Sequence, residues 1–281
     1  MPNPDGRLDP EYTIRPDEAA DSVTLLRYRE YVLHSALDDF RHRYAGTALG
    51  VLWNVLLPLV QIGIYSVVFT EVMSSRLSGP LRDTAFPLYL CAGFFPWIAF
   101  ADCATGGADA FLKNASLLRK LAIPEEVFVA RAALTATFGL GVSLVLLLGA
   151  VLAWGGPPRP AWLLVPVVAL LLQAFGLGLG LVFSCLNVLF RDLSPFLPVL
   201  LQIWMWTTPV VYSETILPPA MRAALPWNPA WPFIDAFHRI VLAGEVPPAI
   251  GWTRMLVFAS ASLVLGTATV RRFRPVIRDL L

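Results

Sequence analysis

Long apolar runs separated by short polar connections dominate the hydrophobic pattern of this chain. Several runs approach 20 residues, which is about the length that a helix needs to cross a hydrocarbon core of about 30 Å. The pattern therefore predicts an all-α polytopic membrane protein with six transmembrane helices. The predicted spans are Leu52–Met73, Phe86–Cys103 (with Ala110 as an alternative end), Val127–Trp154, Ala161–Phe190, Pro195–Tyr212 and Met255–Val270.

The stretch after the fifth span is apolar but repeatedly broken by proline. Its last piece, Trp231–Ala243, has helical periodicity, yet it rises only about 20 Å, too little to cross the core. Irregular backbone is tolerated at membrane depth only against protein or a watery cavity. We therefore expect external re-entrant half-helices over about residues 217–243, between spans five and six.

An amphipathic segment, residues 22–44, leads directly into the first span. Its position and its apolar stripe predict a helix lying in the membrane interface; a soluble helix packed on a partner is the alternative. Residues 1–21 are rich in acidic side chains and lack an apolar run, so they predict a disordered cytoplasmic tail without a cleavable signal peptide. Residues 22–281 are expected to form a single transmembrane domain.

Composition supports this class, with 57% hydrophobic and 15% charged residues, against about 45–50% and about 25% in soluble domains. A net charge of +1 gives no basis for binding nucleic acid. With the N-terminus inside, twelve Lys and Arg side chains flank the cytoplasmic span ends and six the external ones. This bias predicts that both termini are cytoplasmic. The three cysteines lie in or beside apolar spans and predict small buried side chains.

The chain offers little for catalysis. It has no phosphate-binding glycine loop, no metal-protease motif and no nucleophile elbow, so we expect no enzyme, no metal site and no cofactor on this chain. Asp102 and Arg131 lie near the cytoplasmic ends of adjacent spans. At this position we expect the two side chains either to pair with each other or to extend to water. Their distance from mid-span argues against a proton relay.

Aromatic side chains gather toward the external half of the predicted bundle. They could form the interfacial belt common in membrane proteins, or a surface on which sugar rings stack. The candidate pore aromatics are Tyr65, Phe94, Phe95, Trp97, Trp204, Trp206 and Tyr212, of which Trp204 and Trp206 lie within a span. The candidate external gate residues are Trp227, Trp231, Phe233, Asp235 and Phe237.

A short amphipathic segment, residues 114–126, joins the second and third spans. Its helical part ends at Ile123-Pro124, because proline cannot continue a helix but readily begins the next one. The segment suits a docking surface; a plain connecting loop held at the headgroups is the alternative. The fourth span carries Gly176, Gly178 and Gly180, a pattern that permits close approach of a neighbouring helix.

Several separated motifs resemble the membrane subunit of type-2 ABC transporters, especially exporters of O-antigen, capsule or teichoic acid. Together they cover most of residues 25–245. They are Leu26-Arg27-Tyr28-Arg29-Glu30, Arg43-Tyr44, Leu49-Gly50-Val51-Leu52-Trp53 with Pro58, Tyr89–Trp97 with Phe100, Asn114–Lys120 with Ile123-Pro124, Asn187-Val188 with Arg191-Asp192, Thr208–Tyr212, Trp227-Asn228-Pro229 and Pro232–Phe237.

The resemblance implies a permease that forms a central pore as a homodimer and exports a lipid-linked polysaccharide across the cytoplasmic (inner) membrane. It also implies two copies of a separate ATP-binding subunit that carry the ATP and Mg. The implied docking residues for that subunit are Asn114, Leu117, Leu118, Arg119, Lys120, Ile123, Pro124 and Glu125. The implied entrance for the anionic lipid pyrophosphate is formed by Arg27, Arg29, Arg41 and Arg43.

Two features depart from the family pattern: the interfacial helix carries Asp38-Asp39, where the family is more basic, and the acidic N-terminal tail has no counterpart. The first puts direct capture of the pyrophosphate by this helix in question. A type-2 permease for a drug or small lipid is the main alternative function, and a polytopic membrane glycosyltransferase is a more distant one.

Overall fold

The computed structural model describes residues 28–43, 46–53, 55–61, 63–64, 86–120, 123–153, 157 and 159–280. All regular secondary structure within these ranges is helical, which confirms the predicted all-α class. Four helices there are long and apolar enough to cross a membrane, and they match the second, third, fourth and sixth predicted spans. They are α4 (Phe86–Lys113), α6 (Glu126–Ala153), α7 (Val165–Leu189) with the preceding 3-10 turn η5 (Pro160–Leu164), and α11 (Ala249–Leu280).

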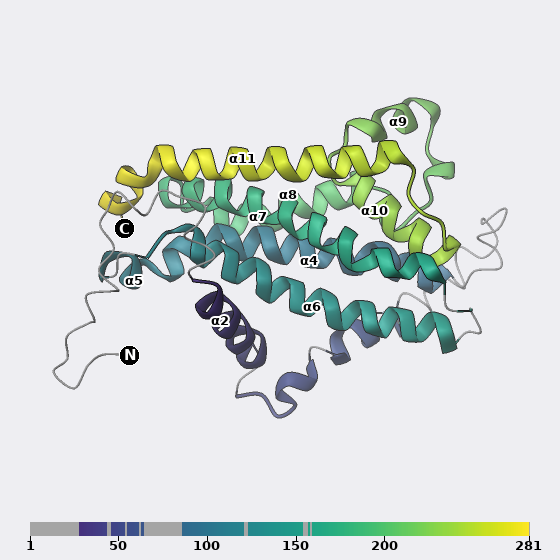
Figure 1. Cartoon of the computed structure of the whole chain (residues 1–281), viewed down its shortest axis with the longest axis horizontal. Coiled ribbons are helices and arrows are strands. Elements are labelled where there is room, and N and C mark those ends of the chain that lie inside the picture. Colours follow the sequence, from purple (N-terminus) through teal and green to yellow (C-terminus); the bar gives the residue numbers. More distant parts are fainter. Residues whose placement is uncertain are drawn as a thin grey trace.

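The four long helices pack side by side in the order α6, α4, α7, α11 (Figure 1). The short helix α5 (Ala115–Lys120) and the C-terminal turns of α11 lie at one end of this bundle. Two other short helices, α9 (Pro219–Ala224) and α10 (Trp231–His238), lie at the opposite end. We refer to these as the α5 end and the α10 end.

Glycines allow the long helices to approach one another closely. A Cβ atom on Gly107 of α4 would lie 2.7 Å from the Cα of Gly180 on α7. On the other side of α7, a Cβ on Gly266 of α11 would lie 2.5 Å from the carbonyl oxygen of Gly178. Real Cβ atoms do not tolerate such distances, so small residues set both helix crossings. The predicted role of the α7 glycines in close approach is confirmed, and their partners are α4 and α11.

Two predicted spans differ from the helices observed. The first, Leu52–Met73, lies only partly within the described ranges, where residues 50–52 form the 3-10 turn η3 (Gly50–Leu52) and residues 55–61 are helical. The fifth is helix α8 (Leu193–Thr207), which ends at Thr207 and not at Tyr212. Its 15 residues rise only about 22 Å, less than a full crossing.

A series of short elements follows α8: the 3-10 turns η6 (Glu214–Ile216) and η7 (Leu225–Trp227) flank α9, and a π-helical turn η8 (Arg239–Ala243) extends α10. Gly244 ends η8 with φ +69°, a conformation that favours glycine. The guanidinium of Arg159 donates a hydrogen bond to the carbonyl of Leu242 and covers this turn. The broken, partly helical character predicted for residues 217–243 is present.

Helix α2 (Arg29–His42) is the described part of the predicted interfacial helix and packs across α6. It buries Val32 and Ala36, and the hydroxyl of Thr135 lies 3.4 Å from the carbonyl oxygen of Ala36. Residues 22–27 and the tail predicted over residues 1–21 lie outside the described ranges.

Candidate functional site

A polar cavity of about 410 Å³ lies between α2, α4 and α6, toward the α5 end. Two ion pairs tie α2 to its neighbours along this cavity. Arg43 Nη2 donates to Asp102 Oδ2 of α4 at 2.6 Å, and Arg131 Nε of α6 lies 2.9 Å from Asp39 Oδ2. Sequence reasoning expected Asp102 and Arg131 to reach water or each other, and each instead pairs with α2 or the residue that follows it. The expectation missed these partners because they are distant in sequence.

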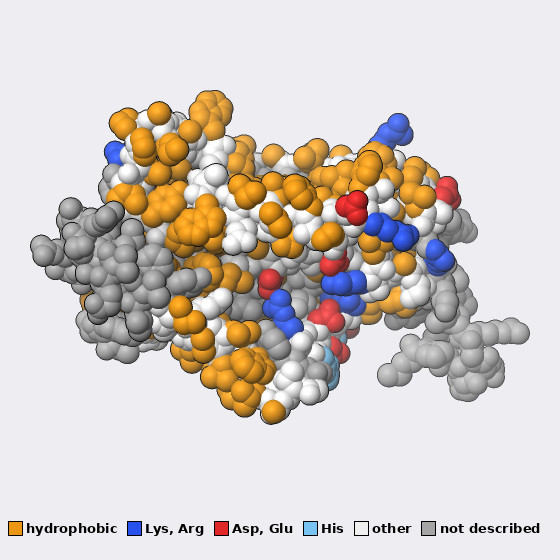
Figure 2. All heavy atoms as spheres, turned by 180° about the vertical axis from the view of Figure 1, so that it is seen from behind, with side chains coloured by type: hydrophobic (Ala, Val, Ile, Leu, Met, Phe, Trp, Pro, Cys, Tyr) orange, Lys and Arg blue, Asp and Glu red, His pale blue; other side chains and the backbone are white. Residues whose placement is uncertain are grey.

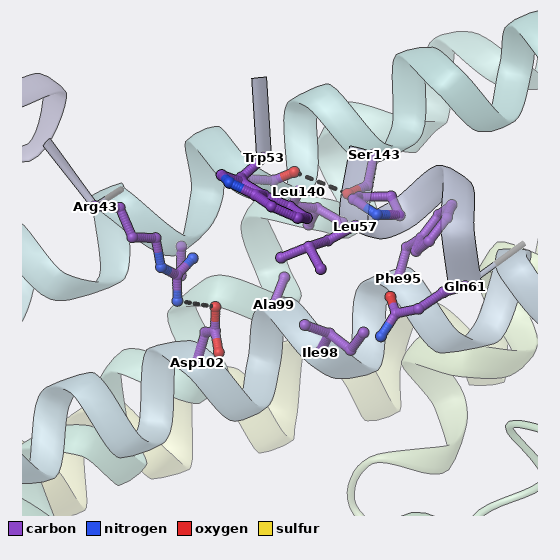
Figure 3. A pocket seen from close by; sticks show the side chains of 13 residues that line it. Arg43, Trp53, Leu57, Gln61, Phe95, Ile98, Ala99, Asp102, Leu140 and Ser143 are labelled. Carbon is purple, nitrogen blue, oxygen red and sulfur yellow. Dashed lines mark hydrogen bonds and ion pairs between the residues drawn. The ribbon is translucent and has the colours of Figure 1, made fainter. Parts of the chain in front are cut away.

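A second cavity of about 240 Å³ adjoins the first and shares Arg43 and Asp102 with it (Figure 3). The residues around it are more apolar and include Trp53, Leu57 and Phe95, together with the polar Gln61 and Ser143. The Arg43–Asp102 pair therefore lies where a charged cavity meets a mainly apolar one. This arrangement suits a ligand with an anionic head and an apolar or amphipathic body.

Only one of the predicted entrance arginines within the described ranges lines these cavities. Arg43 contributes to both, whereas Arg29 and Arg41 are exposed on α2 and line neither, and Arg27 lies outside the described ranges. His42 and Lys113 line the polar cavity in addition. No separate sequence signal marked His42, although its place next to Arg43 at the end of α2 could have suggested it.

A partly buried group of polar side chains joins the ends of α4 and α7 to the beginning of α8. The carboxylate of Asp109 accepts hydrogen bonds from Ser194 Oγ at 2.6 Å and from Asn187 Nδ2 at 3.3 Å, and lies 3.0 Å from Lys113 Nζ. Asn187 also donates to the carbonyl of Ala108 at 3.0 Å. The polar stretch after α7 is thus fixed to α4, and sequence reasoning missed Asp109.

The predicted docking segment presents some of its side chains outward and buries others. Leu117 is 37% exposed, Ser116 and Arg119 are exposed, and Leu118 is only 7% exposed. Asn114 Nδ2 donates to the carbonyl of Ala110 at 2.7 Å, which stabilises the junction of α4 and α5. Beyond α5, Ile123 is half-buried, and both Pro124 and Glu125 are buried; the side chain of Lys120 is not described.

Most of the predicted pore aromatics are packed inside this single chain. Phe94, Phe95 and Trp97 are at most 8% exposed. Trp204 packs edge-on against Trp97, Phe100 and Phe175 at centroid distances of 6.0, 5.6 and 6.3 Å. The indole Nε1 of Trp204 donates to Asn228 Oδ1 at 2.9 Å. The Trp204 ring is half-buried: it packs against the core beneath α10 and also lines a cavity between α8 and α9, and the expectation that it faces a pore stays a prediction.

Trp206 and Tyr212 line the same cavity as Trp204, which has a volume of about 370 Å³ and lies between α8 and α9. Trp206 is 54% exposed, and Tyr212 is half-buried with its hydroxyl donating to the carbonyl of Trp206 at 2.9 Å. Apolar side chains such as Leu217 and Met221 complete the wall. These two aromatics can offer ring faces to a ligand; Tyr65 lies outside the described ranges.

The predicted external gate residues include both buried and exposed side chains. Phe233 and Phe237 are fully buried, and Phe233 stacks on Phe175 at 5.5 Å, so these rings anchor α10. Trp227 is 85% exposed, and Trp231 packs near the guanidinium of Arg254 at 5.8 Å. Asp235 accepts from Arg239 Nε at 2.7 Å.

Sequence reasoning did not single out His238, which fixes α10 to α4. Its ring stacks on Tyr89 at a centroid distance of 4.0 Å, and its Nε2 lies 3.1 Å from the carbonyl oxygen of Tyr89. Because that oxygen can only accept, Nε2 carries a hydrogen. Burial lowers the pKa of His238 to about 4, so the ring is neutral at pH 7.

These features define a polytopic helical membrane protein with a charged cavity near one end and an aromatic one near the other. A family model for the ABC-2 type transporter matches residues 35–242. The chain belongs to the ABC-2 type transporter family.

Named relatives agree with this family. The chain is 31% identical to the O-antigen export system permease protein RfbA of Myxococcus xanthus, across 86% of this chain and 90% of that protein. It is 26% identical to a protein of the same name from Klebsiella pneumoniae, across 73% and 78% of the two chains. It is 23% identical to the polysialic acid transport protein KpsM of Escherichia coli, across 84% and 90%.

Proposed function

We propose that this chain is the membrane subunit of an ATP-driven ABC exporter that moves a lipid-linked polysaccharide across the cytoplasmic membrane. The observation that carries the proposal is the similarity to an O-antigen export permease over 90% of that protein's length. A match of this extent includes both cavities and both ends of the bundle. It favours glycan export over the export of a drug or small lipid by a type-2 permease, and over glycosyl transfer.

The proposed assembly is a homodimer of this chain with two copies of an ATP-binding subunit, which bind the ATP and Mg. Residues 114–126, which we call the coupling segment, dock in that subunit. Exposed Leu117 and Arg119 on α5 are available for such a contact. Binding and hydrolysis of ATP on the partner supply the free-energy difference between pore states, which the substrate by itself does not.

The proposed substrate path begins at the polar cavity. Arg43 and Lys113 line it, each paired with a carboxylate, Asp102 and Asp109, and an incoming lipid diphosphate would compete with these carboxylates for the two cations. Asp39 faces Arg131 at 2.9 Å, so its charge is compensated and does not oppose an anionic head. Toward the other end, the exposed ring of Trp206 offers a stacking surface for sugar units.

The proposed topology has six spans and both termini in the cytoplasm; the first span and α8, the latter extended by the non-helical residues 208–212, complete the four long helices. Residues 22–281 form the permease domain, preceded by a cytoplasmic tail, and α9 and α10 belong to external half-helices. Charged side chains gather toward the α5 end in Figure 2, which supports a cytoplasmic α5 end. Cysteines placed at Ser116 and Arg222 test the topology: a membrane-impermeant thiol reagent should label only Arg222→Cys in intact cells.

A deletion strain tests the function. Loss of this chain should abolish surface polysaccharide while lipid-linked glycan accumulates inside, and a plasmid copy should restore export. Normal surface glycan with altered drug resistance or lipid export would support the alternative permease. Loss of glycan synthesis without accumulation of a lipid-linked precursor would support a glycosyltransferase.

A further inference from the structure

Four charged side chains join the end of the coupling segment to the last turns of α11. Arg274 Nε lies 2.9 Å from Glu125 Oε2, and its Nη2 lies 2.8 Å from Glu126 Oε1. Arg278 Nε donates to Glu125 Oε1 at 2.8 Å. These pairs link residues about 150 positions apart in the sequence. We call the four residues the Glu–Arg cluster.

The cluster is buried around its central carboxylate. The side chain of Glu125 is 0% exposed and that of Arg274 is 18% exposed, while Arg278 is 41% exposed. A carboxylate removed from water is tolerated only when cations and hydrogen bonds compensate it. The buried Glu125 carboxylate is therefore stable only while Arg274 and Arg278 of α11 contact it. The position of the coupling segment consequently depends on α11.

An apolar core lies beside the cluster and joins the same elements. Leu118 of α5 belongs to a buried group with Phe111, Phe128, Val270 and Ile277. This group is separate from the larger core that runs from Leu88 through α7 to α10. The α5 end thus has a core of its own, to which both α5 and the last turns of α11 contribute side chains.

Helix α11 also contacts α7 along its length, where Gly178 and Gly266 hold the two backbones together. Tightly packed helices transmit a displacement because their interface does not deform continuously. A displacement of α5 can therefore be transmitted to α7 through α11. It can also be transmitted through α4 and α6, which precede and follow α5 in the chain.

We propose that Glu125, Arg274 and Arg278 are positioning residues that lock the coupling segment to α11, so that the ATP-binding partner moves both as one unit. The proposal rests on the proposed function. It assigns a transmission role to the C-terminal turns of α11. A purely local role would confine the cluster to stabilising the loop between α5 and α6.

A double-mutant cycle on the complete transporter reconstituted with its ATP-binding partner tests the proposal. The variants are Glu125→Gln, Arg278→Gln and the double variant, and the readout is glycan exported per ATP hydrolysed. Each single change should lower this ratio about tenfold. The double variant should show the same tenfold loss relative to the wild type, because both changes disrupt the same interaction. Arg272→Gln, an exposed position on the same turns, is the matched control and should leave the ratio near that of the wild type.

Retention of the ATP-binding partner during purification is measured in parallel and should stay near the wild-type amount in every variant. Unchanged export per ATP in Glu125→Gln or Arg278→Gln would overturn the proposal. A double variant whose export per ATP falls about a hundredfold would also overturn it, because the two effects would then be independent. The same holds if export falls only in proportion to the amount of ATP-binding partner lost.

Arg278 is half-exposed, so Arg278→Gln with rescue by Arg278→Lys carries the test if Glu125→Gln does not insert into the membrane. A wild-type complex that hydrolyses ATP without moving glycan would contradict the proposed function, and this is measured separately, before any variant is compared.

Discussion

Trp204 and Trp206 lie two positions apart on α8 and differ in burial, although both line the cavity between α8 and α9. Successive helical positions turn by about 100°, so residues two apart face different directions. Trp204 follows Leu197 and Leu201 at helical spacing, and both of these are buried, whereas Trp206 is 54% exposed. This difference in burial follows from helical periodicity in the sequence, and the assignment of both rings to a pore surface stays a prediction.

Replacing each tryptophan by alanine should separate structure from transport. Trp204→Ala removes a ring packed on three others and one of the two hydrogen bonds that Asn228 Oδ1 accepts, the other coming from Ala230 N. It should cost about 3–5 kcal/mol of stability, measured as a lower Tm of the purified protein. Trp206→Ala should leave Tm nearly unchanged and lower glycan export several-fold. Equal effects of the two changes on Tm would contradict these assignments.

His238 makes the stability of the protein depend on pH. Its pKa of about 4 in the folded chain lies below the ordinary 6.5, so the unfolded chain binds the proton more readily. The stabilising contribution is therefore complete above pH 6.5 and is lost as the pH falls toward 4.

Lowering the pH from 7.5 to 5 should cost about 2 kcal/mol through this histidine, or about 5 °C in Tm. Glu214 and Asp235 line the same small cavity and are present in both the wild type and the variant. His238→Gln keeps a donor for the Tyr89 carbonyl and should reduce the pH dependence. An identical drop in Tm for wild type and His238→Gln would assign the effect to other groups.

At the scale of elements, length and hydropathy were sufficient for the long helices. Spans two, three, four and six follow from apolar runs of 16 to 30 residues, because backbone polar groups in lipid need intrahelical partners, although α11 extends beyond its predicted run at both ends. The end of the fifth was wrong, since hydropathy continues through Val210 and Val211 while the helix ends at Thr207. Those residues are buried against protein, and hydropathy does not distinguish protein from lipid.

Helix α5 offers a matched pair of adjacent leucines for testing the docking surface. Leu117 is 37% exposed and Leu118 is 7% exposed in the core shared with α11. Leu117→Asp should release the ATP-binding subunit while the permease keeps its Tm. Leu118→Asp buries a carboxylate and should destabilise the permease itself by several kcal/mol. Full retention of the partner by Leu117→Asp would remove α5 as its docking site.

The glycine contact between α7 and α11 gives a second prediction at this scale. Gly266→Ala places a methyl group only 2.5 Å from the Gly178 carbonyl oxygen, so α11 must shift and Tm should fall. A Cβ atom on Gly149 of α6 would have nothing within 4 Å, and Gly149→Ala should be neutral or slightly stabilising because alanine favours helix. A higher Tm for Gly266→Ala than for Gly149→Ala would contradict the close crossing.

At the scale of the whole molecule, sequence motifs indicated the family, and the comparisons confirmed it. The motifs did not indicate which side chains distant in the sequence contact one another. Asp102 with Arg43 and Glu125 with Arg278 are pairs set by tertiary packing, and neither periodicity nor spacing determines them. The result is a bundle whose charged cavity and coupling segment lie toward one end and whose exposed aromatic cavity lies toward the other.

The central claim is that this chain, driven by a separate ATP-binding subunit, moves a lipid-linked polysaccharide across the membrane. The most direct measurement is translocation in proteoliposomes that contain both subunits and the lipid-linked glycan, with a glycan-specific lectin reporting the sugar on the far face. We expect lectin binding to rise with ATP and to stay at background without ATP or without this chain. Lectin binding that is independent of either one would contradict the central claim.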